Sequence, residues 1–307
     1  MSMNDIKYLE KIPPLEILAK QVVEGFITGM HKSPFHGFSV EFAEHRLYNK
    51  GESVRDVDWK LFAKTEKLFV KRYEEETNLR CQLIIDDSSS MSFPQSENKK
   101  LENLNKIGFS ALAAASLLEI LKRQRDAFGL CIYSDQLDYY APAKGSERQK
   151  RMLMDQLEKL MQKPGSKTTN TYQILHEVAE KIHRRSLIFL FTDMLQSDKK
   201  EEELISALRH LKYNKHEVVL FHIYSGKYEL ELNFDERPKK FVDVETGERI
   251  NVFAQNYRED YKRMMEEFFK QLKMKCMQYK IDYVPVDIHQ GFEKVLSAYL
   301  LKRQQIL

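Results

Sequence analysis

The chain has 307 residues, of which 42% are hydrophobic and 31% charged, and its formal net charge is +3. This length can bury at least one full core, as one large domain or two. The near-balanced charge gives no case for nucleic-acid binding, and the apolar runs are too short to cross a bilayer. Residues 1–15 lack the apolar core of a signal peptide, so we expect a cytoplasmic protein, or one peripheral to the membrane.

The three cysteines show no disulfide or zinc pattern. Cys81, Cys131 and Cys276 are far apart, and no Cys-x-x-Cys or His-x-x-x-His spacing accompanies them. We therefore expect three reduced thiols.

An N-terminal segment, 1–78, differs in character from the rest of the chain. Pro13 and Pro14 precede an apolar pattern that predicts an amphipathic helix from Leu15 to about Phe26. Residues 31–80 are densely charged and include a strand-like piece at 67–73. We expect this segment to precede a main domain at 79–307.

From Leu79 onward, strand patterns alternate with helix patterns. The strands are near-continuous apolar runs, which favours an α/β fold with a mostly parallel sheet and helices on both faces. Residues 227–253 interrupt the alternation, and Gly247 there separates the two short strands of a predicted hairpin, 241–244 and 249–252. Strands are expected at 79–86, 127–133, 137–141, 186–192, 217–224 and 281–286, and helices at 101–124, 146–162, 171–184, 200–212, 257–279 and 291–303.

Oxygen-bearing side chains occur at three places that the ends of the strands could bring together. Asp86, Ser88 and Ser90 form an Asp-x-Ser-x-Ser motif directly after the first strand of the main domain. A threonine-rich loop at 168–171 leads into a helix, and the pair at 192–193 ends the most apolar strand. Ligands of open α/β sheets bind beyond the carboxyl ends of the strands, and such oxygens suit a hard cation such as Mg²⁺. Taken alone, each cluster could equally be a helix cap or an ordinary loop.

Together and in this order, the three clusters resemble the metal-ion-dependent adhesion site of the von Willebrand factor A fold. The resemblance implies that Ser88, Ser90 and Thr169 offer hydroxyl groups to the metal, while Asp86 and Asp193 act directly or through water. It also implies a von Willebrand factor A-like (Rossmann-like) fold and Mg²⁺ as the cofactor, with Mn²⁺ or Ca²⁺ as alternatives. The sixth position would be open to an Asp or Glu of a protein partner.

A second resemblance covers nearly the whole chain. The motifs at 37–48, 51–59 (Gly-Glu-x-x-Arg-x-x-Asp-Trp) and 70–76 are similar to those of the bacterial domain-of-unknown-function 58 family. Members carry a von Willebrand-like domain after this segment and are typically encoded beside AAA+ ATPases of the MoxR type. The resemblance therefore implies such an ATPase as partner. Glu52 stands where the family often has Asp, and no transmembrane helix precedes the motifs as it does in many relatives.

These features predict a non-enzymatic, metal-dependent protein-interaction module, an adaptor that works with a MoxR-type ATPase. Two alternatives stay open. One is a phosphatase-like hydrolase with Asp86 as nucleophile, although such chemistry usually places a second carboxylate two residues later, where Ser88 stands. The chain also lacks a Gly-rich phosphate loop and a Gly-x-Ser-x-Gly elbow. The other alternative is a scaffold that has kept the fold but binds no metal.

Overall fold

The computed structural model describes residues 14–31, 45–47, 62–63, 65, 69–71, 79–94, 104–162, 171–194, 201–234, 237–242 and 248–306. The chain divides into two compact units, Met1–Ile27 with Leu79–Leu307, and Thr28–Asn78. The boundary expected from the sequence lies at 78/79, and the structure groups the residues up to Ile27 with the sheet. In the smaller unit, β1 (His45–Leu47) pairs antiparallel with β2 (Phe69–Lys71). The motif at 51–59 lies outside the described residues.

Six strands form the central sheet, in the spatial order β10-β7-β6-β3-β4-β5. All neighbouring strands are parallel except β5, which runs antiparallel to β4. The mostly parallel α/β sheet predicted from the sequence is therefore confirmed. The strands are β3 (Arg80–Asp86), β4 (Ala127–Tyr133), β5 (Leu137–Lys144), β6 (Leu187–Thr192), β7 (Glu217–Tyr224) and β10 (Asp282–Asp287).

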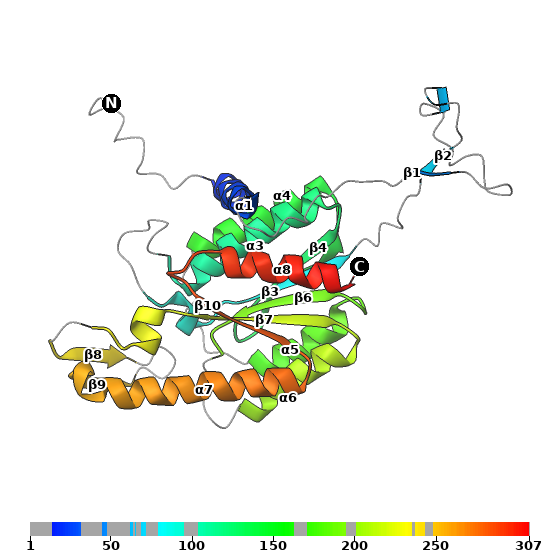
Figure 1. The fold of residues 1–307 in the computed structure, drawn as a ribbon. Coiled ribbons are helices and arrows are strands. Elements are labelled where there is room, and N and C mark those ends of the chain that lie inside the picture. Colours follow the sequence, from blue (N-terminus) through cyan, green and yellow to red (C-terminus); the bar gives the residue numbers. More distant parts are fainter. Residues whose placement is uncertain are drawn as a thin grey trace, which may run out of the picture. The chain divides into compact units, whose positions relative to one another are not determined.

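Helices cover both faces of this sheet, as Figure 1 shows. Successive side chains of a strand point to opposite faces, so Leu83 and Ile85 of β3 join one core cluster while Ile84 joins the other. The three cysteines are free, as expected from the sequence, and all three are buried. The first core contains residues of α1 (Leu15–His31), α3 (Lys106–Arg123), α4 (Glu147–Gln162) and α8 (Glu293–Ile306), and the second contains residues of α5 (Thr171–Lys181), α6 (Glu201–Tyr213) and α7 (Arg258–Gln278).

The order of the strands reverses direction between β3 and β6. From β3 the chain passes through α3, on one face, to β4; from β6 it passes through α6, on the other face, to β7. The two connections diverge, so the carboxyl ends of β3 and β6 border a topological switch point, which is where open α/β sheets bind ligands.

An insertion between β7 and α7 contains the predicted hairpin. It begins with η6 (Gly226–Leu230), a single π-helical turn, and continues to β8 (Lys239–Val242) and β9 (Arg249–Val252), which pair antiparallel. The first hairpin strand therefore starts two residues earlier than expected. The hairpin lies at one side of the sheet, beside the first turns of α7 (Figure 1). In the described part of the chain, no helix combines the length and apolar character needed to span a membrane.

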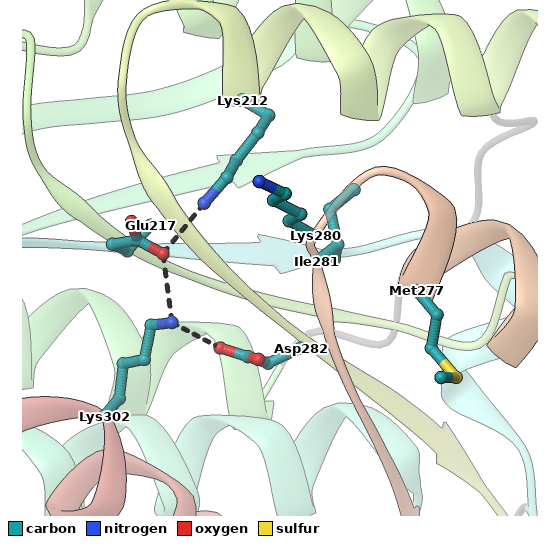
Figure 2. A pocket seen from close by; sticks show the side chains of 7 residues that line it. All are labelled: Lys212, Glu217, Met277, Lys280, Ile281, Asp282 and Lys302. Atoms are coloured by element: carbon teal, nitrogen blue, oxygen red, sulfur yellow. Dashed lines mark hydrogen bonds and ion pairs between the residues drawn. The ribbon is translucent and has the colours of Figure 1, made fainter. Parts of the chain in front are cut away.

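The strand-start edge of the sheet, meaning the end at which β7 and β10 begin, carries an exposed pocket with several charged side chains (Figure 2). Lys212 Nζ and Lys302 Nζ lie 2.8 and 3.0 Å from Glu217 Oε2. Lys302 Nζ also lies 2.8 Å from Asp282 Oδ2. The ends of α6 and α8 are thereby tied to the first residues of two strands.

Candidate functional site

Two adjacent strands end in buried carboxylates at the switch point. Asp86 is the last residue of β3, Asp193 follows the last residue of β6, and each is 2% exposed. Ile85 pairs with Phe191 in the sheet, so Asp86 lies beside Thr192. The Thr192 hydroxyl donates a hydrogen bond to Asp86 Oδ2, at 2.7 Å. The register of the sheet thus fixes the position of the first predicted ligand.

The turn after β3 brings the two predicted serine ligands together. The Ser88 amide donates to Asp86 Oδ1 at 3.0 Å, and Ser88 Oγ lies 3.1 Å from Ser90 Oγ. Ser88 occupies the N-cap position of η3 (Ser89–Ser92), but its side chain makes no capping hydrogen bond. In octahedral Mg²⁺ coordination with bonds of about 2.1 Å, adjacent oxygens lie about 3.0 Å apart. The two hydroxyl groups therefore have the spacing of neighbouring ligands.

A lysine that the sequence analysis did not single out completes this edge of the sheet. Lys106, the first residue of α3, is 0% exposed, and its Nζ lies 2.8 Å from Asp193 Oδ2. The same ammonium group forms a short ion pair with Glu229 of η6. Glu229 in turn accepts a hydrogen bond from the Ser225 amide at 2.7 Å. Lys106 could not be recognised from the sequence, because nothing in the local pattern marks a lysine at the start of a helix as buried.

The buried side chains carry more negative than positive charge. Burial, and then the charge of Asp193, raise the pKa of Asp86 to about 6, although hydrogen bonds from Thr192 and Ser88 act in the opposite direction. Burial also raises the pKa of Glu229, despite the nearby ammonium of Lys106. Burial lowers the pKa of His222, on the adjacent β7, to about 4, so this imidazole is neutral at neutral pH.

Two carboxylates, Asp193 and Glu229, contact the single ammonium group of Lys106, and a third, Asp86, lies near Asp193 without contacting the lysine. Burial pulls the pKa of Lys106 down, but Asp193 and Glu229 outweigh this and hold it above its ordinary value, so the lysine stays charged. The formal balance of these four side chains is two negative charges, which equals the charge that one divalent cation would supply. Together with the spacing of the serine hydroxyls, this balance fits a divalent cation beside Asp86.

The structure brings four of the five predicted ligands to one edge of the sheet. Asp86, Ser88 and Ser90 share one turn, and Asp193 follows the neighbouring strand. Thr169 lies outside the described residues. Within the described ranges, no group of three or more His, Cys, Asp or Glu side chains is arranged to hold a metal ion. A site here would therefore depend on the serine hydroxyls as well as on carboxylates.

Comparison with protein families identifies the chain. The family model described as "Protein of unknown function DUF58" matches residues 44–269, well over half of the sequence. The chain belongs to the DUF58 family. The match covers β1 of the smaller unit and most of the sheet, and it begins within the motifs noted at 37–76. The sheet of this DUF58 chain has a von Willebrand factor A-like α/β fold.

Relatives of this DUF58 chain are distant. The uncharacterized proteins Rv1480 of Mycobacterium tuberculosis and Mb1516 of Mycobacterium bovis are each 22% identical over 193 residues, 63% of this chain. The match spans 59% of the length of these relatives.

Several solved structures are similar to the DUF58 chain at 11–12% identity. BatB from Bacteroides thetaiotaomicron matches with a TM-score of 0.42, over 74% of this chain and 99% of BatB. An aerotolerance-related membrane protein from Bacteroides fragilis gives 0.44, over 73% and 99% of the two chains. The SpRpn10 VWA domain gives 0.36, over 72% and 95%.

Proposed function

We propose that this chain is a metal-dependent protein-interaction module. Ser88, Ser90 and Thr169, from the threonine-rich loop at 168–171, would offer hydroxyl groups to Mg²⁺, and Asp86 and Asp193 would hold it directly or through water, with Mn²⁺ or Ca²⁺ as alternatives. The bound cation would supply an electron-poor centre for an Asp or Glu side chain of a partner protein. This chain's own residues would position the cation and leave the acid of the partner to complete its coordination.

One observation carries this proposal. Asp86 is buried at a switch point with two serine hydroxyls 3.1 Å apart in the same turn, and with Asp193 on the adjacent strand. The pKa of Asp86 is raised first by burial and then by the negative charge of Asp193. Neutral hydroxyl ligands would leave much of the cation's charge available to an incoming carboxylate.

Membership of the family supports the broader role. A von Willebrand factor A-like fold in a DUF58 protein favours a protein-interaction module over an enzyme. Because members of the family are typically encoded beside MoxR-type AAA+ ATPases, we propose such an ATPase as the partner and an adaptor or chaperone-associated role for this chain.

The geometry supports the phosphatase-like alternative less well. A nucleophilic aspartate needs an accessible oxygen, but Asp86 is 2% exposed and both of its carboxylate oxygens accept hydrogen bonds. The position two residues later holds Ser88, so the second carboxylate of such chemistry is not supplied there.

Calorimetric titration with MgCl₂ after removal of metal by chelation tests the cation site. We expect binding by the wild-type chain and at least about a tenfold loss in the Ser90→Ala variant, which lacks one ligand. Ser89→Ala removes a neighbouring hydroxyl outside the predicted set and should bind as the wild type does. Equal affinities of all three proteins, or no binding by the folded wild type, would reject the site.

Capture of a MoxR-type AAA+ ATPase from the same organism tests the proposed partner. The immobilised wild type should retain it in Mg²⁺, and a variant with Asp86, Ser88 and Ser90 all replaced by alanine should not. Because the ATPase itself needs Mg²⁺ for nucleotide binding, the comparison of variants in constant Mg²⁺ isolates this site better than a chelator does. Equal retention by both proteins would contradict a metal-bridged contact.

A further inference from the structure

Lys106 occupies a position that is electrostatically unfavourable for a cation. It is the first residue of α3, and the amino-terminal end of a helix carries partial positive charge. Its side chain is 0% exposed, so its ammonium group has also lost its hydration. The helix needs no lysine at this position, because Asn105 caps it by accepting a hydrogen bond from the Gly108 amide at 2.8 Å. The reason for the charge must lie in what the ammonium group contacts.

The two contacts of Lys106 join the candidate site to the insertion. Asp193, one of the predicted ligands, lies 2.8 Å from Lys106 Nζ, and Glu229 belongs to η6, where the insertion begins. Both carboxylates are nearly buried, with side chains 3% and 12% exposed. The lysine is therefore a fixed positive charge within the anionic cluster at the ends of the strands.

The fold holds Glu229 in this position from two directions. The Ser225 amide donates to its second oxygen at 2.7 Å. On the neighbouring residue of η6, the Tyr228 ring packs edge-on against Phe93, which follows η3, with ring centroids 5.9 Å apart. Rings of Phe234 and Phe241 continue this contact at 5.2 and 5.3 Å, as far as β8. These contacts of the insertion therefore hold Glu229 in place beside Lys106.

We propose that Lys106 sets the affinity of this site for divalent cations. Its ammonium group neutralises part of the negative charge of Asp193 and Glu229, and so keeps cation binding weak and readily reversible. This inference rests on the proposed function, because it concerns the same cation site. It assigns Lys106 and Glu229, which lie outside the predicted ligand set, opposite effects on one binding constant.

Calorimetric titration of the full chain with MgCl₂ at neutral pH tests the inference. Lys106→Met keeps most of the length of the unbranched side chain but removes its charge, and we expect at least about tenfold tighter Mg²⁺ binding. Adding Glu229→Gln to this variant restores the original charge balance and should return the affinity to within a few-fold of wild type. Lys302→Met makes the same charge change at the opposite edge, where Lys302 also contacts two carboxylates, and should change the affinity less than about twofold.

The outcomes separate this inference from the proposed function. Binding by the wild type with equal or weaker binding by folded Lys106→Met would overturn the role of Lys106 but leave the cation site standing. Binding by Lys106→Met alone would support the role of Lys106 and reject metal dependence of the wild type. Binding by neither folded protein would overturn both.

Glu229→Gln alone provides a test that keeps the lysine. If Lys106→Met does not fold, as judged by its thermal melting curve, Glu229→Gln carries the decision, because it removes one negative charge and leaves the ion pair of Lys106 with Asp193. Mg²⁺ binding should then weaken by about tenfold. An unchanged affinity in this variant would overturn the inference.

Discussion

Each end of the sheet places a lysine between two carboxylates, with opposite electrostatic results. At the strand starts, Lys302 contacts Glu217 and Asp282, whose side chains are 41% and 48% exposed. Burial acts to raise the pKa of Glu217, but hydrogen bonds from Lys212 and Lys302 outweigh it, and the pKa lies below its ordinary value. At the strand ends, Lys106 contacts two nearly buried carboxylates, and the pKa of Glu229 is raised.

The difference between the two edges comes from solvent and from the number of charges. Water screens the exposed network, so its ion pairs add little and serve mainly to tie α6 and α8 to the sheet. At the buried edge, Asp86 adds a third carboxylate that no lysine contacts in the described residues. The same kind of ion pair therefore links helices to the sheet at the strand starts and forms part of a buried charged site at the strand ends.

The largest expected effect separates the two lysines by their contribution to stability. Lys106→Met leaves Asp193 and Glu229 buried without their counter-charge, so the free energy of unfolding in chelator should fall by about 3–5 kcal/mol. Lys302→Met removes a solvent-screened contact and should lower it by less than about 1 kcal/mol. Urea unfolding of both variants measures the difference, and equal losses would mean that the two networks do not differ in kind.

The pH dependence of stability provides the second contrast. Folded Asp86 has a pKa of about 6, above its ordinary 3.8, so between about pH 4 and pH 6 the folded chain holds a proton that the unfolded chain has released. The stabilisation that comes from the raised pKa of Asp86 is therefore fully present below about pH 4 and is lost as the pH rises to about 6. Asp86→Asn cannot titrate, so in chelator its stability relative to wild type should rise across this window by about 2–3 kcal/mol.

Thermal or urea unfolding at a series of pH values measures this relative stability. Excess Mg²⁺ should reduce the advantage of Asp86→Asn, because a cation bound by the wild type alone would stabilise only that protein. Parallel curves for the two proteins between pH 4 and pH 6 would contradict the raised pKa of Asp86.

Local sequence pattern was enough to predict the sheet. β4 and β7 have the predicted bounds, 127–133 and 217–224, because near-continuous apolar runs between polar turns are typical of buried parallel strands. Asp86 and Asp193 could be placed at one edge for the same reason, since parallel strands end on the same side. β1 was not predicted, because three residues are too few to show a period.

The electrostatic partners of the site could not be predicted from local pattern. Lys106 and Glu229 are 123 residues apart in the sequence, and only the folded chain brings their side chains together. In the sequence, Glu229 belongs to a charged stretch that resembles any exposed loop. The predicted ligands are recognised by short spacing within one turn, whereas charge balance depends on contacts that the whole fold creates.

The third contrast compares one glycine at each edge. An alanine Cβ at Gly226 would lie 2.4 Å from Asp287 Oδ2, and that carboxylate is held because its other oxygen accepts hydrogen bonds from the Gly226 and His289 amides. Gly226→Ala should therefore destabilise the chain by about 1–3 kcal/mol. It should also weaken Mg²⁺ binding, because η6 presents Glu229.

Gly145 is the matched control at the strand-start edge. It follows β5, whose last residue Lys144 pairs with Phe128 near the start of β4, and an alanine Cβ there would meet only the Asp126 carbonyl oxygen at 3.5 Å. Gly145→Ala should change the free energy of unfolding by less than about 0.5 kcal/mol. A loss at Gly145 as large as that at Gly226 would remove the distinction between the edges.

The smallest expected effect concerns salt. Glu217→Gln breaks two lysine contacts at the exposed edge and should lower the free energy of unfolding by about 1 kcal/mol or less at low ionic strength. In about 1 M NaCl, where the Debye length is about 3 Å, this loss should largely disappear. The loss from Lys106→Met should persist at the same salt concentration, because ions in solution do not reach a lysine that is 0% exposed. Urea unfolding of both variants at low and high salt therefore tests whether solvent access causes the difference between the two edges. If high salt abolished the stability loss of Lys106→Met as well as that of Glu217→Gln, Lys106 would be accessible to ions in solution.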